Sequence, residues 1–89
     1  MVKLNKNDLI KIQILKQFKK KNISYTASLL ASRLGNKHET IKKALEFFSY
    51  IGILEKEIKE HGKQNYIYYN LTELGIKLIE EQKFYKELG

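Results

Sequence analysis

Apolar residues recur at helical spacing near the start of the chain. Ile10, Ile14 and Phe18 are each four residues apart, with lysine and glutamine among the residues between them. Side chains four apart lie on one face of an α-helix, so the pattern predicts a helix over residues 7–21 that faces a core. Asn7 is the expected N-cap, because its side-chain oxygen can accept a hydrogen bond from a free amide of the first turn.

A second, shorter helix is predicted over residues 26–34. Thr26 has the side chain of an N-cap, and Gly35 follows the last periodic residue, where glycine ends many helices in the left-handed conformation. The residues expected to face the core are Leu29, Leu30 and Leu34.

A third helix is predicted over residues 37–51, and Gly52 ends it. Asn36 and Glu39 have the spacing of a capping box, in which the N-cap side chain and a carboxylate three residues later each satisfy a free amide. The expected buried stripe consists of Ile41, Leu45, Phe48 and Ile51.

After Gly52 the pattern changes to that of strands. Residues 53–59 have the length of a strand, and the tyrosine-rich residues 66–71 are strongly strand-prone. The polar residues 60–65 between them contain a glycine and predict the loop of a hairpin that spans residues 53–71.

A last helix is predicted over residues 72–88, beginning at Thr72. Gly75 is expected to weaken its first turn by up to about 1 kcal/mol relative to alanine. No proline, repeat or low-complexity linker interrupts residues 1–89, so we expect one domain. The order of three helices, a hairpin and a helix predicts an α+β, mainly α fold with the plan of a winged helix.

Three stretches resemble winged helix-turn-helix regulators. Residues 25–35 are similar to the first helix and turn of that motif, and residues 38–54 to the recognition helix that follows. Residues 68–75, with the run Leu-Thr-Glu-Leu-Gly, resemble the second wing strand and the last helix of MarR-type and PadR-type regulators. The resemblance covers about residues 9–80. It implies sequence-specific binding of double-stranded DNA by a transcriptional regulator, with repression as the expected outcome.

The resemblance also implies which residues contact DNA. A major groove about 12 Å wide accepts a helix whose first turns carry short or polar side chains. Lys42 is the residue expected to contact base edges. The family usually has arginines in this helix, and lysine lacks their bidentate hydrogen-bonding geometry. Phe47 takes a position that is usually polar in the family. The expected contacts from the helix-turn-helix are Arg33, Lys37, His38, Thr40, Lys42 and Lys43, and those from the wing are Lys59, His61, Lys63, Gln64 and Asn65.

The last helix carries more apolar residues than a small core needs. Family members often pair through terminal helices, so the resemblance implies a homodimer. The residues expected at the dimer contact are Leu74, Leu78, Phe84, Tyr85 and Leu88.

The charge of the chain is uneven and supports a polyanionic partner. The formal net charge is +7. Residues 1–50 carry ten lysines and Arg33 against three acidic residues, whereas residues 51–89 carry six lysines against seven glutamates. A basic field of this kind attracts nucleic acid.

Several classes of function are not expected. The chain has no cysteine, and its two histidines are far apart, so we expect no metal and no cofactor. No nucleophile with a base and no phosphate-cradling loop stands out, which argues against an enzyme, and no pocket for a small-molecule ligand is evident. The chain has no long apolar run and no signal-peptide pattern, so we expect a cytoplasmic protein without a membrane partner.

Two other functions fit the same residues. A winged helix also serves as a protein–protein interaction or complex-assembly module, and the apolar Phe47 and Tyr50 favour that interpretation. RNA binding is the other, since phosphate attraction does not distinguish the two nucleic acids. The three tyrosines of residues 66–69 resemble a base-stacking platform, but packing of Tyr69 and Leu71 on the core is the simpler interpretation.

Overall fold

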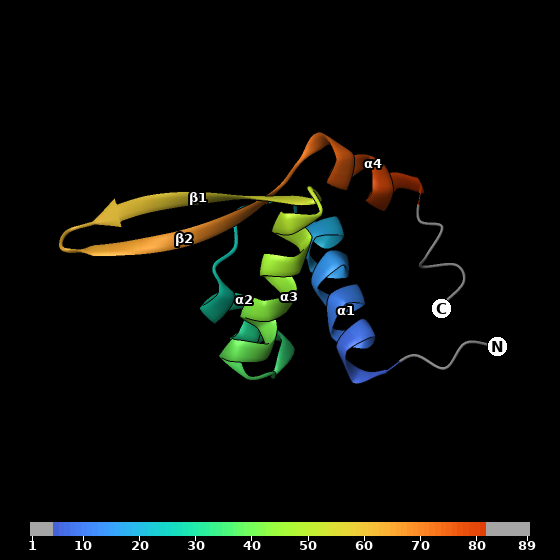
Figure 1. Ribbon diagram of the computed structural model, residues 1–89, viewed down its shortest axis with the longest axis horizontal. Coiled ribbons are helices and arrows are strands. Elements are labelled where there is room, and N and C mark those ends of the chain that lie inside the picture. The colour runs from blue at the N-terminus through green and yellow to red at the C-terminus, as the bar shows by residue number, and fades with distance from the viewer. Residues whose placement is uncertain (1–4, 82–89) are drawn as a thin grey trace.

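The computed structural model describes residues 5–81, and its elements follow the predicted order (Figure 1). They are α1 (Lys6–Lys20), α2 (Ala27–Leu34), α3 (His38–Tyr50), β1 (Leu54–His61), β2 (Gln64–Leu71) and α4 (Glu73–Glu81). The predicted α+β, mainly helical fold class is confirmed. Three residues predicted for a dimer contact lie outside the described residues, namely Phe84, Tyr85 and Leu88.

The N-cap residues of α1 and α2 each accept a backbone hydrogen bond through a side-chain oxygen, but the N-cap residue of α1 differs from the prediction. The amide of Leu29 donates to Thr26 Oγ1 at 3.1 Å, as expected for α2. In α1 the cap is Asn5 and not Asn7, because the amide of Asp8 donates to Asn5 Oδ1 at 2.8 Å. Asparagine is a favourable N-cap residue at both positions, which are two residues apart, so the local sequence does not determine which of them caps the helix.

The turn between α2 and α3 contradicts the predicted capping box. Gly35 ends α2 with a φ of +65°, as predicted, and the amide of Asn36 donates to the carbonyl oxygen of Ala31 at 3.1 Å. Asn36 thus belongs to the turn, and its side chain donates to the carbonyl oxygen of Leu34 at 3.4 Å. The N-cap of α3 is Lys37, which makes no side-chain cap hydrogen bond.

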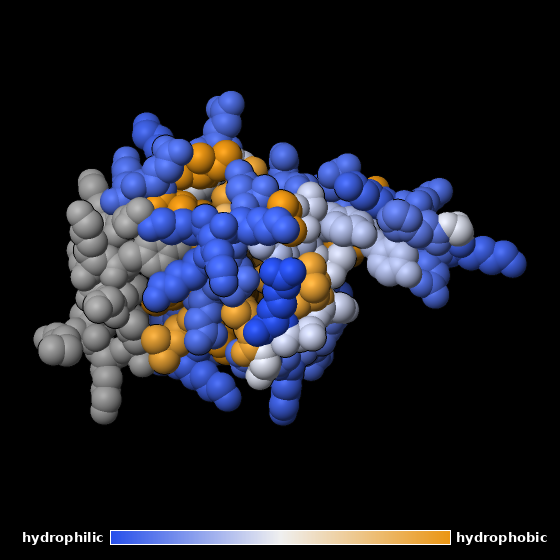
Figure 2. Space-filling model, turned by 180° about the vertical axis from the view of Figure 1, so that it is seen from behind, coloured by the Kyte–Doolittle hydropathy of each residue, from blue (hydrophilic) through white to orange (hydrophobic). Residues whose placement is uncertain are grey.

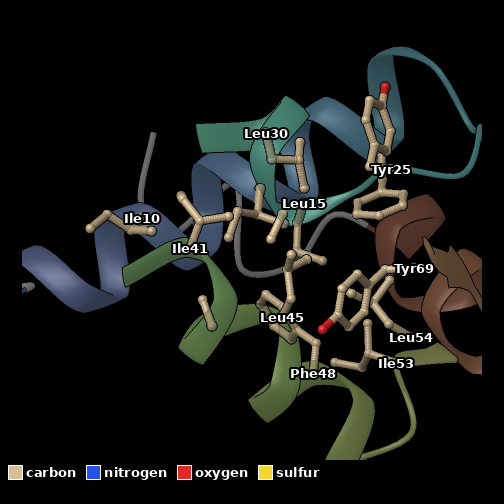
Figure 3. Packing of buried hydrophobic residues seen from close by; sticks show 14 of the residues in the cluster. Ile10, Leu15, Tyr25, Leu30, Ile41, Leu45, Phe48, Ile53, Leu54 and Tyr69 are labelled. Carbon is tan, nitrogen blue, oxygen red and sulfur yellow. The ribbon is translucent and has the colours of Figure 1, made fainter. Parts of the chain in front are cut away.

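The core forms where the apolar faces of the first three helices meet the base of the hairpin (Figure 3). The predicted burial is wrong for two residues, since Leu29 is 38% exposed and Ile51 is 41% exposed. Leu29 is turned by about 100° around α2 from the buried Leu30, and Ile51 is the C-cap residue of α3, where the backbone leaves the helix. The correctly predicted buried residues are Ile10, Ile14, Phe18, Leu30, Ile41, Leu45, Phe48 and Tyr69, and Leu15 of α1 is buried with them.

The strands of the hairpin are longer than predicted, and its turn is shorter. Strands β1 and β2 pair antiparallel over all eight residues of each, so only Gly62 and Lys63 form the tip in place of a six-residue loop. Gly62 has a φ of +65°, which two-residue hairpin turns need and glycine adopts at no steric cost. The hairpin projects away from the helices, and its surface is mostly hydrophilic or intermediate, whereas apolar atoms gather on the helical body (Figures 1 and 2).

Helix α4 is docked through Thr72 and Gly75. Thr72 Oγ1 accepts a hydrogen bond from the amide of Gly75 at 3.1 Å and donates to the carbonyl oxygen of Gly52 at 2.5 Å. Gly75 is buried, and a Cβ at this position would lie 2.3 Å from the carbonyl oxygen of Ile53. The expectation that Gly75 only weakens the helix is therefore incomplete, because the missing Cβ lets α4 approach the chain before β1.

We expect Gly75→Ala to destabilise the protein by about 1–3 kcal/mol, since the added methyl group must displace a backbone carbonyl. Helix propensity alone predicts the opposite sign, a gain of up to about 1 kcal/mol. Urea denaturation followed by circular dichroism separates the two effects. The exposed Lys77→Ala in the same helix is the control and should change stability by less than about 0.5 kcal/mol. A Gly75→Ala variant more stable than wild type would contradict the close approach.

Candidate nucleic-acid interface

The solvent-facing side of α3, with its N-cap, carries half of the basic and histidine residues predicted for DNA contact. Ile41 and Leu45 are fully buried, and the helical period turns the charged residues between them toward solvent. The five predicted residues at this helix are Lys37, His38, Lys42 and Lys43, which are exposed, and Thr40, which is half-buried.

Two clefts flank the solvent-facing side of α3. The hairpin-side cleft has a volume of about 190 Å³ and brings His38 and Lys42 together with Asn65 of β2 and the start of α2. The α1-side cleft has a volume of about 270 Å³ and brings Thr40 and Lys43 together with residues of α1. The two clefts share no α3 residue, but a further hollow on the solvent-facing side of α3 brings His38 and Lys42 together with Lys43.

The end of the hairpin presents polar groups that two tyrosines support. The ring of Tyr66 lies 5.4 Å from that of His61, and its hydroxyl donates to Gln64 Oε1 at 2.7 Å. Lys59 Nζ lies 4.9 Å from the ring centroid of Tyr68. Sequence reasoning missed this supporting role of the tyrosines, since it depends on a strand register that follows only from the two-residue tip.

Arg33 is not brought to either cleft. Its guanidinium carbon lies 5.8 Å from the ring centroid of Tyr25. Ser28 of α2 lines the hairpin-side cleft. Arg33 lies five residues later, so its side chain is turned by about 140° from that of Ser28 around the axis of α2. Contact between Arg33 and DNA stays a prediction.

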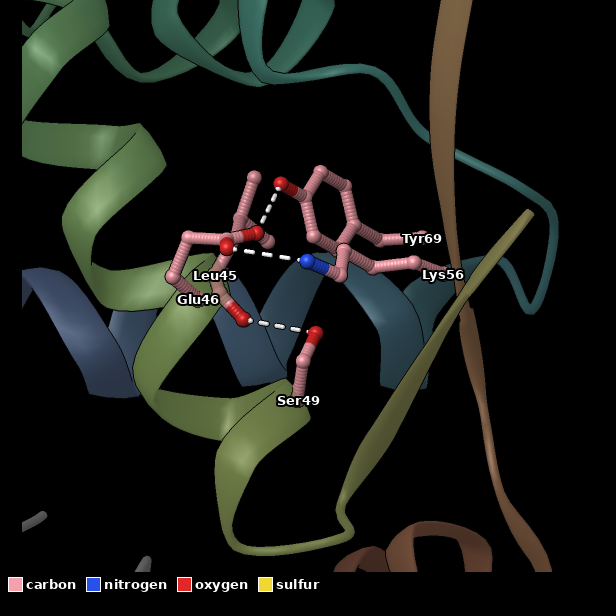
Figure 4. Close-up of polar contacts among 5 residues, drawn as sticks. All are labelled: Leu45, Glu46, Ser49, Lys56 and Tyr69. Atoms are coloured by element: carbon pink, nitrogen blue, oxygen red, sulfur yellow. Dashed lines mark hydrogen bonds and ion pairs between the residues drawn. The ribbon is translucent and has the colours of Figure 1, made fainter. Parts of the chain in front are cut away.

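Glu46 connects α3 to the hairpin (Figure 4). Its Oε2 accepts a hydrogen bond from the hydroxyl of Tyr69 at 2.6 Å, and its Oε1 forms an ion pair with Lys56 Nζ at 3.0 Å. The Tyr69 hydrogen bond, followed by the one from Lys56, lowers the pKa of Glu46. Burial and the neighbouring carboxylate raise the pKa of Tyr69. Lys56 thus balances the negative charge that Glu46 places beside the basic residues of α3.

Sequence reasoning gave no role to Glu46 or Lys56. Glu46 is ten residues from Lys56 and 23 residues from Tyr69 along the chain. The register pairs Lys56 with Tyr69, so both side chains lie on the same face of the hairpin. One signal was present, because a tyrosine predicted to pack on the core needs a partner for its hydroxyl group.

The candidate interface consists of ammonium, imidazole, hydroxyl and amide groups, which bind anions and hydrogen-bond acceptors. Among residues 5–81, no group of three or more histidine, aspartate or glutamate side chains is placed to hold a metal ion. The helices of this same part of the chain are too short or too polar to cross a membrane.

Solved structures with the same arrangement of elements include several proteins named as regulators. A proposed transcriptional regulator of Thermoplasma acidophilum superposes with a TM-score of 0.75 at 20% identity, over 92% of this chain and 84% of its own. The protein smu.1704 of Streptococcus mutans superposes with a TM-score of 0.71 at 22% identity, over 97% of this chain and 87% of its own. A PadR family transcriptional regulator of Eggerthella lenta superposes with a TM-score of 0.70 at 15% identity, over 91% of this chain and 78% of its own.

The chain has a winged-helix fold. In this fold α2 and α3 form the helix-turn-helix and the hairpin of β1 and β2 is the wing. No protein-family model and no curated protein matches the sequence.

We expect Tyr69→Phe to destabilise the winged helix by about 1 kcal/mol, because it removes one hydrogen bond to a partly exposed charged group. The same change should cost less in a Glu46→Gln background, where the amide oxygen still accepts the hydrogen bond but carries no charge. Thermal denaturation of the two single variants and the double variant measures this coupling. Equal losses from Tyr69→Phe in both backgrounds would show that the charge of Glu46 adds nothing to this hydrogen bond.

The lowered pKa of Glu46 predicts a loss of stability in acid. A carboxylate with a depressed pKa in the folded state contributes stability that is complete above its ordinary value of 4.5. That contribution is lost as the pH falls through the lowered pKa, where the folded protein also takes up the proton. The stability difference between wild type and Glu46→Gln should therefore narrow from pH 6 toward about pH 3. A difference that does not change with pH would rule out this contribution.

Proposed function

We propose that this protein binds double-stranded DNA in a sequence-specific manner and regulates transcription. The observation that carries the proposal is the row of exposed basic residues on α3, flanked by a cleft on each side. The regulators with the same fold support it. Occupation of a promoter by α3 and the hairpin is sufficient to block competing proteins, so repression is the simplest regulatory outcome.

Helix α3 has the dimensions and surface for the major groove. A helix with its side chains is about 10–12 Å across, close to the groove width of about 12 Å. His38, Lys42 and Lys43 project from its first two turns as donors for phosphate oxygens and for acceptor atoms of base edges. The Glu46 carboxylate repels phosphates less than an unpaired acid would, because Lys56 pairs with it.

The hairpin reaches DNA beyond the groove that α3 occupies. A strand of eight residues extends about 25 Å, which is long enough to pass beside the duplex backbone. Lys63 lies at the tip, next to the glycine that forms the turn. We place the tip on the phosphate backbone or in the adjacent minor groove, with Lys59, His61, Gln64 and Asn65 as further donors.

The functional unit that we propose is a homodimer formed through α4. Leu74 is 56% exposed, whereas Leu78 is partly buried against the protein's own core. Leu74 is therefore the more available contact among the described residues. A twofold dimer would place two α3 helices about one turn of DNA apart, roughly 34 Å, and would bind an inverted repeat.

The first test is binding to a mixed-sequence duplex, measured by fluorescence anisotropy over a salt series. Wild type should show a log–log salt slope of about −4 or steeper, which corresponds to four or more phosphates neutralised. Lys42→Ala combined with Lys43→Ala should weaken binding, and Lys63→Ala should make the slope shallower by about one unit. Lys77→Ala on α4 is the control and should leave both quantities unchanged.

Absence of binding at low salt would contradict the proposed function. The alternative is then docking of a partner protein on the end of α3. Tyr50 is 90% exposed there, beside the partly exposed Ile51.

Light scattering at tens of micromolar protein tests the dimer. Wild type should have twice the mass of one chain, and Leu74→Glu should shift it toward a single chain because a charge would have to be buried at the contact. A wild-type monomer at this concentration would refute the dimer and leave DNA binding by a single chain open to the salt-series test.

A further inference from the structure

We propose that the α1-side cleft is a second phosphate-binding site, which takes a phosphodiester group of the DNA strand opposite to the one at the hairpin-side cleft. This inference rests on the proposed function and extends the interface to α1. The new residues in it are Lys11 and Phe47, and neither was expected to contribute to DNA binding from the sequence.

The lining of the α1-side cleft suits a small anion. Its inner surface is formed by the buried Ile10 and Ala44, and its polar groups come from Lys11, Thr40 and Lys43, with Asn7 at the start of α1. The described residues include no acidic side chain in this lining. Two ammonium groups beside a hydroxyl group match the oxygens of a phosphate.

Phe47 holds Lys11 in place at this cleft. Lys11 Nζ lies 4.2 Å from the centroid of the Phe47 ring, a cation–π contact between α1 and α3. Phe47 is 43% exposed, so its ring is a surface support for the ammonium and only partly a core residue. Within residues 5–81, neither Lys11 nor Lys43 forms an ion pair, which leaves both charges available to an external anion.

The position of the cleft relative to α3 explains why it would meet the other strand. A helix in the major groove has the phosphates of one strand on each side. Phe47 lines the α1-side cleft and His38 the hairpin-side cleft, and nine residues of helix separate them by about 180° around the axis. Each cleft therefore faces a different wall of the groove. The cations on both sides would hold α3 centred between the strands.

The test uses the full chain and the same salt series. Lys11→Ala should make the salt slope shallower by about one unit, because one phosphate contact is lost. Lys11→Arg should keep the wild-type slope, since arginine retains the charge and the contact with the ring. Lys77→Ala is the matched control, because it removes the same charge from an exposed position on α4.

Phe47→Leu tests the positioning role without changing any charge. It should weaken DNA binding about two- to fivefold in wild type, the effect expected from loss of one exposed cation–π contact. In a Lys11→Ala background it should have no further effect, because there is no ammonium left to position. Circular dichroism of each variant at the assay temperature confirms that it is folded.

The outcomes separate this inference from the function on which it rests. If wild type fails to bind DNA, the proposed function fails. If wild type binds and responds to loss of Lys42 and Lys43, but Lys11→Ala behaves like Lys77→Ala, the second phosphate site is overturned and the function stands. Titration with inorganic phosphate tests whether the α1-side cleft binds a free phosphate ion instead of a phosphodiester group of DNA. Saturable submillimolar binding that Lys11→Ala abolishes, with unchanged DNA affinity, would assign the cleft to a free phosphate and also overturn the proposal.

Discussion

Tyr69 is the residue through which the hairpin is fixed to the helices. Its backbone exchanges two hydrogen bonds with Tyr25, which lies just before α2, at 2.8 and 3.1 Å. Its ring is buried in the core, and its hydroxyl donates to Glu46 on α3. A long two-stranded hairpin has little stability of its own in water. Its direction relative to α3 is set by these contacts at its base, and the geometry of the hairpin-side cleft depends on that direction.

The charges around α3 are arranged so that the basic residues dominate where a nucleic acid would approach. Glu46 lies among them, but its carboxylate is engaged by Tyr69 and Lys56. Lys42 lines the hairpin-side cleft and Lys43 lines the α1-side cleft, and a second element completes each of them. An α-helix with cations on both flanks and a long hairpin beside it is suited to hold a duplex at several points along both strands. In the proposed complex, many weak phosphate contacts of this kind would give salt-dependent affinity, and contacts of α3 with base edges would give specificity.

The elements themselves followed from local patterns. The apolar spacing of α1 and α3, the Thr26 cap and Gly35 each reflect interactions within a few residues, so the sequence was sufficient to predict them. Errors occurred where two local solutions were nearly equal. Asn5 and Asn7 both suit a cap, and Asn36 is either the cap of α3 or the closing residue of the α2 turn. The loop of the hairpin was predicted too long because polar residues occur equally in exposed strands and in loops.

The sequence by itself determined the winged-helix plan, the location of the basic residues and the start of α2 at the Thr26 cap, because these depend on periodicity, charge and capping. The tertiary structure decided which of those residues act together. It placed Arg33 outside the two clefts, put Lys42 and Lys43 beside different clefts, and brought Glu46, Lys56 and Tyr69 into contact. It also made Gly75 a requirement of packing, through a carbonyl oxygen 22 residues earlier. The physical reason is that these relations depend on strand register and helix docking, which arise from contacts between distant segments that no local pattern records.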